Sequence, residues 1–207
     1  MGKDFCLVAR SMFTMLKMVL LSFLFLFSSF FIQHDAGKRE TNERLAQHAH
    51  SLKSFAKTLN GSTSLGILID MSIASRKNRF FVVNLQNDSV LISGLCAHGQ
   101  GDDVNKEEVV FSNKPGSYCT SEGRYKLGVK FEGDYGTGYI LHGLDSTNSN
   151  ALKREVVFHY YFKVADKEDE NVVCRSNGCP MVSQKTFRAA EKLIDAETKP
   201  VLMWIYK

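Results

Sequence analysis

The sequence has little of what marks several large classes of protein. Three prolines and an apolar content of 44% in 207 residues exclude a disordered or collagen-like chain. The 26 Lys and Arg residues barely outnumber the 22 Asp and Glu residues, so the basic surplus that neutralises phosphates is missing and no nucleic acid partner is expected. Five cysteines are too few for a disulfide-rich scaffold, and the chain is long enough to fold around its own hydrophobic core.

The first 34 residues differ from the rest. Residues 18–32 carry no charge, and Lys3, Arg10 and Lys17 precede them, which is typical of an export signal. A helix of that length spans about 22 Å against a hydrocarbon core of ~30 Å, whereas residues 12–32 suffice if Lys17 reaches the headgroups. We expect residues 1–34 to be a signal peptide or an inner-membrane anchor. The lack of a clean small-residue cleavage pair favours the anchor, with the remainder in the periplasm or cell envelope.

Residues 35–62 predict an amphipathic helix that leads into the domain. Apolar residues recur at spacings of four and three, and Asn60 with Gly61 is a typical helix C-terminus. The apolar positions are Leu45, Ala49, Leu52, Ala56 and Leu59.

Beyond residue 62 the chain changes to short segments rich in β-branched and aromatic residues, separated by turn-forming residues. A helical spacing of apolar residues returns only within residues 183–196. The sequence therefore predicts one mainly β domain over residues 63–207, with a few helices and no second domain boundary. The expected strands lie within residues 65–73, 79–85, 89–99, 118–123, 124–133, 137–144, 155–162 and 201–206.

The candidate chemistry lies between His159 and Pro180. His159 is near the end of a predicted strand, and Cys179 follows a Ser-Asn-Gly turn. A glycine before a cysteine lets the backbone approach a substrate closely, so that N–H groups can face a developing oxyanion. Spacing alone favours a catalytic pair no more than a structural interpretation. In the structural interpretation, Cys179 is disulfide-bonded or buried and His159 is a hydrogen-bonded core residue.

Four further residues have weaker signals. His98 and His142 each precede a glycine at the end of a predicted strand, where a surface turn is favoured over a substrate contact. Arg154 and Arg175 either hold a substrate carboxylate or form ordinary surface ion pairs. Cys174 with Cys179 does not have the spacing of a zinc knuckle, so no metal site is expected.

The run SNGCP at Ser176–Pro180 resembles the Ser-x-Gly-Cys signature of the murein L,D-transpeptidases, the YkuD-type catalytic domain, in the subfamily whose signature continues with Pro. Four other blocks occur in the order found in that subfamily: IDMSIASRKNRFFVVNL, CAHGQG, residues 112–123, and GLDSTNSNALKREVVFH. The resemblance covers residues 45–207 and implies an L,D-transpeptidase-type β-sandwich or barrel-like domain. Common family members carry His and Arg where this chain has Asn177 and Met181.

The resemblance implies an enzyme that remodels peptidoglycan. Cys179 is then the nucleophile and His159 the base, oriented by a backbone carbonyl near Tyr160, with an imidazolium lowering the pKa of the thiol. Gly178 and the neighbouring Ser176, Asn177 and Arg175 would bind the oxyanion and substrate. Tetrapeptide stems serve as donor and acceptor, 3-3 cross-links form through a thioester, and neither metal nor organic cofactor is required.

Three alternatives stay open. The same site could hydrolyse stem peptides, as an L,D-carboxypeptidase does. A disulfide between Cys174 and Cys179 would leave a non-catalytic peptidoglycan-binding envelope protein. A papain-like peptidase is disfavoured, because those enzymes carry Cys before His in the chain.

Overall fold

The computed structural model describes residues 39–103, 108–133, 136–168 and 174–207. The chain divides into two compact units, residues 1–44 and 45–207, and the second contains the sheet and both candidate catalytic residues. The apolar segment at residues 12–32 lies outside the described residues. Within those that are described, no helix is long and apolar enough to cross a membrane.

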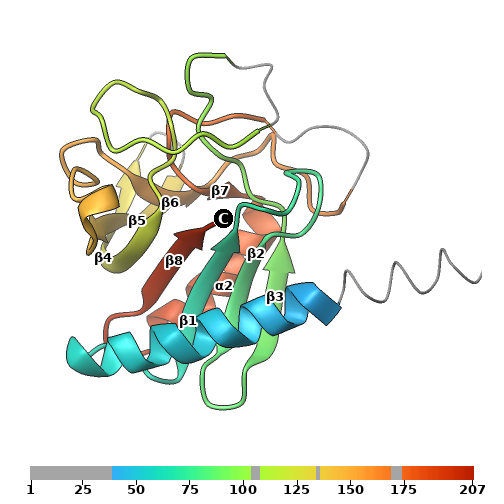
Figure 1. The fold of residues 1–207 in the computed structure, drawn as a ribbon, viewed down its shortest axis with the longest axis vertical. Coiled ribbons are helices and arrows are strands. Elements are labelled where there is room, and N and C mark those ends of the chain that lie inside the picture. Colours follow the sequence, from blue (N-terminus) through green and yellow to red (C-terminus); the bar gives the residue numbers. More distant parts are fainter. Residues whose placement is uncertain (1–38, 104–107, 134–135, 169–173) are drawn as a thin grey trace, which may run out of the picture. The chain divides into compact units, whose positions relative to one another are not determined.

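Eight strands form one sheet in the order β3-β2-β1-β8-β4-β5-β6-β7, which confirms the mainly β prediction (Figure 1). Beyond β3, Ala97 pairs with Met181 of β7, so the chain after one edge strand contacts the other edge and the sheet curls towards a barrel. The strands are β1 (Leu65–Asp70), β2 (Phe80–Asn84), β3 (Ser89–Gly94), β4 (Gly123–Gly133), β5 (Gly136–Gly143), β6 (Val157–Tyr160), β7 (Met181–Val182) and β8 (Leu202–Tyr206).

Two helices cover opposite faces of β1 and its neighbours. The helix over residues 39–58 packs four of the five predicted apolar residues, Leu45 to Ala56, against Leu68 of β1. The fifth, Leu59, lies beyond the end of the helix and is 44% exposed, so it is not part of the packed stripe. Helix α2 (Gln184–Asp195) packs Phe187 on the face that carries Ile67. Figure 1 shows the first helix crossing the sheet and α2 behind it. Because both faces are covered, all six residues of β1 are buried, which explains its nearly continuous apolar sequence.

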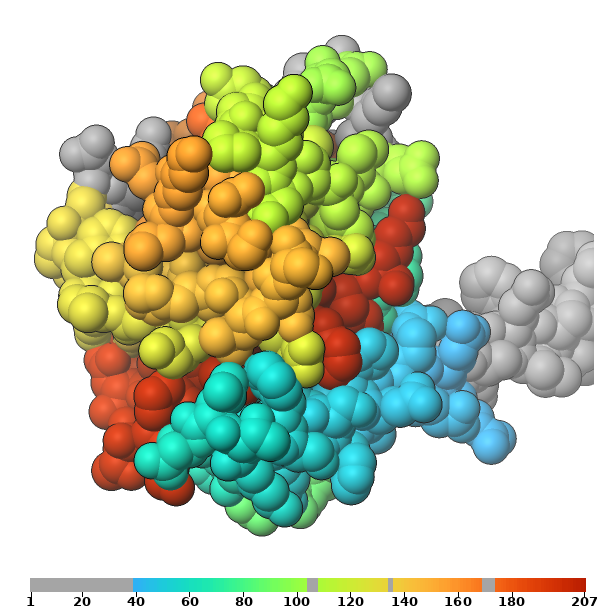
Figure 2. Space-filling view, turned by 60° about the vertical axis from the view of Figure 1, so that its left-hand side comes forward, coloured from blue at the N-terminus to red at the C-terminus, as the bar shows by residue number. Residues whose placement is uncertain are grey.

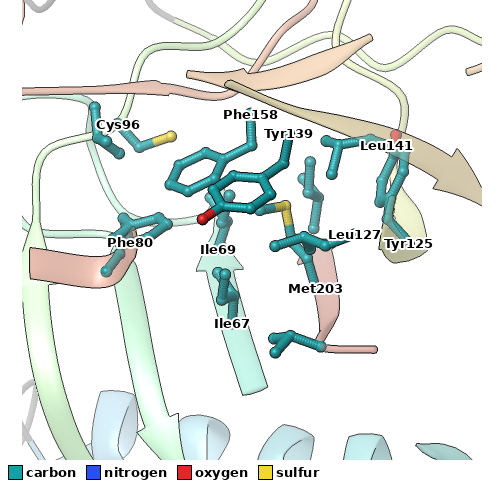
Figure 3. Packing of buried hydrophobic residues seen from close by; sticks show 14 of the residues in the cluster. Ile67, Ile69, Phe80, Cys96, Tyr125, Leu127, Tyr139, Leu141, Phe158 and Met203 are labelled. Atoms are coloured by element: carbon teal, nitrogen blue, oxygen red, sulfur yellow. The ribbon is translucent and has the colours of Figure 1, made fainter. Parts of the chain in front are cut away.

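The core fixes the strand that carries His159. Phe158 of β6 is fully buried, with ring centroids 5.4 Å from Phe80 and 5.2 Å from Phe187, and Figure 3 shows it stacked beside Tyr139. Burying such a ring stabilises the fold by roughly 1.5–3 kcal/mol. Since side chains alternate along a strand, anchoring Phe158 in the core places His159 on the opposite face.

Two local predictions were wrong. Residues 118–122 form an irregular segment instead of a strand, because Tyr118 has a left-handed φ of 53° and only the bridge between Phe111 and Thr120 pairs it. The two-residue strand β7 was not predicted, since two residues show no alternation. A 3-10 helix, η1 (Ser146–Asn148), completes the elements. Figure 2 shows the segments around residues 115 and 150 side by side, joined by a bond from the Asn150 N–H to Asn113 Oδ1 at 3.1 Å.

Candidate active site

Strand pairing brings Cys179 and His159 to one end of the sheet edge. β6 and β7 are parallel, with His159 opposite Met181. Two residues earlier on each segment, the backbone N–H of Val157 donates to Cys179 Sγ at 3.4 Å. Cys179 and His159, the nucleophile and base predicted from the sequence, therefore lie on adjacent segments. Cys179 precedes the register partner of His159 by two residues.

The backbone before Cys179 needs glycine. Gly178 has a φ of +121°, a conformation that other residues rarely adopt. A Cβ at this position would lie 2.7 Å from the carbonyl oxygen of Cys119 and 3.1 Å from Arg154 Nη2. The turn that presents Cys179 is thus packed against residues 112–121 with no room for a side chain.

His159 is oriented by the backbone. Its ring is 7% exposed, and Nδ1 lies 3.0 Å from the carbonyl oxygen of Tyr160. A carbonyl can only accept, so Nδ1 carries the proton and Nε2 has the lone pair that a general base needs. This is the orienting carbonyl expected from the sequence.

Burial opposes the thiolate–imidazolium pair expected from the sequence. It raises the pKa of the Cys179 thiol, against smaller lowering effects of the Val157 N–H and the Arg154 charge. Burial also lowers the pKa of His159. Desolvation thus disfavours the charged form of both groups.

Arg154 is the cation next to the Cys179 turn. Its Nη1 donates to the Ser112 carbonyl at 2.9 Å and to Ser121 Oγ, and its Nη2 donates to the Cys119 carbonyl at 2.6 Å. These partners are neutral, so the surface ion pair, one of the alternatives that the sequence leaves open for Arg154, is absent among the described residues. Arg154 fixes residues 112–121 beside the turn and keeps its positive charge near the thiol.

The signature residues have separate tasks. Ser176 Oγ accepts the Gly178 N–H at 3.1 Å, which leaves the Cys179 N–H as the candidate oxyanion donor. Asn177 is exposed, and its Oδ1 accepts from Gln100 Nε2 at 3.2 Å. Arg175 is half-buried, and its positive charge contributes to lowering the pKa values of Arg79 and His98.

His98 was wrongly expected in a surface turn. It is 1% exposed, and its Nδ1 lies 2.7 Å from Nη2 of the buried Arg79. Burial and this cation lower the pKa of His98 to about 3, so Nδ1 accepts from Arg79. The His98 carbonyl in turn accepts the Ser176 N–H at 2.9 Å. Arg79 thus holds His98, whose carbonyl binds Ser176 of the signature. The sequence analysis missed Arg79, whose only signal was a cation at the start of an apolar strand.

His142 and Cys174, the remaining candidates, are not part of this site. His142 is half-buried near the end of β5. Cys174 and Cys179 are both free thiols that pack against the cluster of Leu95, Ala97, Val164 and Met181. Among the described residues there is no group of three or more side chains able to hold a metal ion.

The candidate site thus consists of a cysteine behind a tight glycine turn and a carbonyl-oriented histidine on the adjacent parallel strand. A family model described as the L,D-transpeptidase catalytic domain matches residues 38–206. The chain therefore belongs to the L,D-transpeptidase catalytic domain family.

Solved structures similar to this chain include L,D-transpeptidases. The enzyme from Xylanimonas cellulosilytica is 12% identical, with 70% of this chain and 61% of that chain covered and a TM-score of 0.37. The L,D-transpeptidase from Mycobacterium smegmatis is 15% identical, with 70% and 59% covered and a TM-score of 0.41. The helical cell shape determining protein Pgp2 from Campylobacter jejuni is 12% identical, with 77% and 56% covered and a TM-score of 0.46. This chain thus spans less than two thirds of their lengths. A search of curated proteins found no match.

Proposed function

We propose that this chain is an exported cysteine L,D-transpeptidase that joins peptidoglycan stem peptides by 3-3 cross-links. The observation that carries the proposal is that Cys179 and a carbonyl-oriented His159 lie on adjacent parallel segments in a chain of this family. A thiol, a base and backbone N–H donors are the groups that two-step acyl transfer needs.

In the first step the Cys179 thiol gives its proton to His159 Nε2 as sulfur attacks the carbonyl of the third stem residue. The tetrahedral oxyanion is held by the Cys179 N–H and by the nearby positive charge of Arg154. When the intermediate collapses, His159 returns the proton to the nitrogen of the departing D-Ala. A thioester between Cys179 and the donor stem remains.

In the second step the side-chain amine of a diamino acid on another stem attacks the thioester. His159 takes a proton from the attacking nitrogen and returns it to sulfur as the thioester breaks. The product is an amide between two third residues, and the free thiol is restored. Water in place of the amine gives hydrolysis by the same groups.

The test is mass spectrometry of disaccharide tetrapeptides incubated with the full chain. Transfer gives a dimer whose mass equals two monomers less one D-Ala, whereas hydrolysis gives only the disaccharide tripeptide. A dimer joined between the third residues supports the proposal. If only the tripeptide forms, the chain is an L,D-carboxypeptidase. If the disaccharide tetrapeptide stays unchanged, both activities are excluded.

Export is part of the proposal, since stem peptides lie outside the cytoplasm. Its support is the uncharged run at residues 18–32 behind three cations. A reporter fused after Lys207 that is active only in the cytoplasm should stay silent. A bright reporter would contradict export.

A further inference from the structure

The hydroxyl of Thr120 lies between the backbone at Gly99 and the turn before Cys179. Thr120 is fully buried, and a buried hydroxyl needs hydrogen-bond partners. Its Oγ1 accepts the Gly99 N–H at 2.8 Å and donates to the carbonyl oxygen of Gly178 at 3.4 Å. The two bonds are compatible, because a hydroxyl accepts with its lone pairs and donates its one proton.

The backbone that carries Thr120 is tightly packed against both glycines. A Cβ on Gly99 would lie 2.5 Å from the Thr120 nitrogen, and a Cβ on Gly178 would lie 2.7 Å from the Cys119 carbonyl oxygen. That carbonyl also accepts from Arg154 Nη2 at 2.6 Å. The Thr120 hydroxyl is therefore held in a fixed place beside the Gly178 carbonyl.

The bond to the Gly178 carbonyl determines the direction of the Cys179 N–H. Both groups belong to one peptide unit, which is planar and trans, so the C=O and the N–H point in opposite directions. Glycine has more backbone freedom than other residues, so a peptide unit next to it needs an anchor. The N–H of Gly178 is anchored by Ser176 Oγ at 3.1 Å, and its carbonyl is anchored by Thr120.

We propose that Thr120 is a positioning residue that directs the Cys179 N–H at the oxyanion. This inference rests on the proposed function, in which that N–H stabilises the tetrahedral intermediate. The negative charge of the intermediate polarises the N–H and makes the Gly178 carbonyl of the same peptide unit a stronger acceptor. A bond of 3.4 Å is long for two oxygens, and long hydrogen bonds in free enzymes often tighten in the transition-state complex. Thr120 thus acts mainly on the transition state.

The test removes the hydroxyl in the full chain with two variants, Thr120→Ala and Thr120→Val. For both, the maximal rate of D-Ala release from disaccharide tetrapeptide in a single turnover should fall about tenfold, or ~1.4 kcal/mol. Loss of a whole oxyanion donor costs about 100- to 1,000-fold, and loss of its orientation costs less. The half-saturating concentration should stay within about twofold, because the lost interaction is made in the transition state. Thr120→Ser keeps the hydroxyl and should stay within about threefold of the unmodified rate.

Alkylation of Cys179 by iodoacetamide distinguishes orientation of the N–H from displacement of the whole turn. This reaction displaces iodide from a carbon atom and forms no oxyanion. Its rate, measured on the peptide that contains Cys179, depends on the thiolate and its exposure and should stay within about twofold in the Thr120 variants.

Ser62→Ala is the matched control for stability. Ser62 is also buried, and its hydroxyl accepts a backbone N–H, that of Leu65 at 3.0 Å. It precedes β1 and is not part of the candidate site. Loss of this hydroxyl leaves a buried N–H without its acceptor, as Thr120→Ala does for Gly99, so both variants should unfold at lower urea concentration. Only Thr120→Ala should lose D-Ala release.

D-Ala release at the unmodified rate by Thr120→Ala and Thr120→Val would overturn the role of Thr120 while the proposed function stands. A parallel loss of alkylation would also overturn it, since the whole turn would then have moved. If both variants lack a cooperative urea transition while Ser62→Ala has one, Thr120 serves the fold and the assignment is wrong. An unmodified chain that releases no D-Ala and forms no thioester would overturn the proposed function and this inference together.

Discussion

Gly178→Ala should disable the site while leaving the fold in place. The new methyl would stand 2.7 Å from the Cys119 carbonyl oxygen, and this neighbour is backbone that cannot rotate away. The φ of +121° adds strain of about 1–3 kcal/mol. Relief of both requires the Cys179 turn to move by a sizeable fraction of an ångström, and a misplacement of about 1 Å costs on the order of 100-fold in rate.

Gly116→Ala is the matched control. Gly116 also has a left-handed φ, +77°, but nothing lies within 4 Å of a Cβ there, so this variant carries backbone strain without a clash. D-Ala release from tetrapeptide, measured with both variants, should fall about 100-fold for Gly178→Ala and stay within about threefold for Gly116→Ala. Release at the unmodified rate by Gly178→Ala would refute the account of the turn.

Three further predictions concern charge and the signature. Arg154→Gln should raise the pKa of the Cys179 thiol and slow its alkylation at pH 7 by about three- to tenfold; an unchanged pH profile of alkylation would contradict this. The pKa of His98 is about 3 in the fold and ~6.5 when unfolded, so its contribution to stability is complete above pH 6.5 and is lost as pH falls. The free energy of unfolding in urea should therefore drop by about 2 kcal/mol between pH 6.5 and 5, and an equally steep drop in His98→Gln would show that another group is responsible. Asn177→His should keep D-Ala release within about tenfold, since Asn177 is exposed and its side chain accepts a hydrogen bond from the Gln100 side chain; a larger loss would give Asn177 a role in the reaction.

The elements with strong periodicity were predictable. The strands β1, β2 and β8 lie within the segments expected for them, and α2 falls inside residues 183–196. Their patterns follow from burial, which the side-chain types encode directly. β7 and the irregular segment at residues 118–122 were not predictable, because partners far away in the chain determine them.

The backbone of the candidate site was more predictable than its electrostatics. The sequence indicated the turn before Cys179 through its glycine, because the requirement for a positive φ is local. The burial that shifts the pKa values of both groups was not predictable, because desolvation depends on how completely the fold encloses Cys179 and His159. Arg79 was missed and His98 was wrongly expected at the surface for a related reason: both are polar residues whose burial depends on each other.

The central claim is that Cys179 carries the acyl group. Intact mass spectrometry of the full chain, stopped with acid during turnover of disaccharide tetrapeptide, should show an adduct equal to the donor less D-Ala. Digestion should place that adduct on the peptide containing Cys179, and Cys179→Ala should show neither adduct nor D-Ala release. Release of D-Ala by Cys179→Ala at the rate of the unmodified chain would contradict the account.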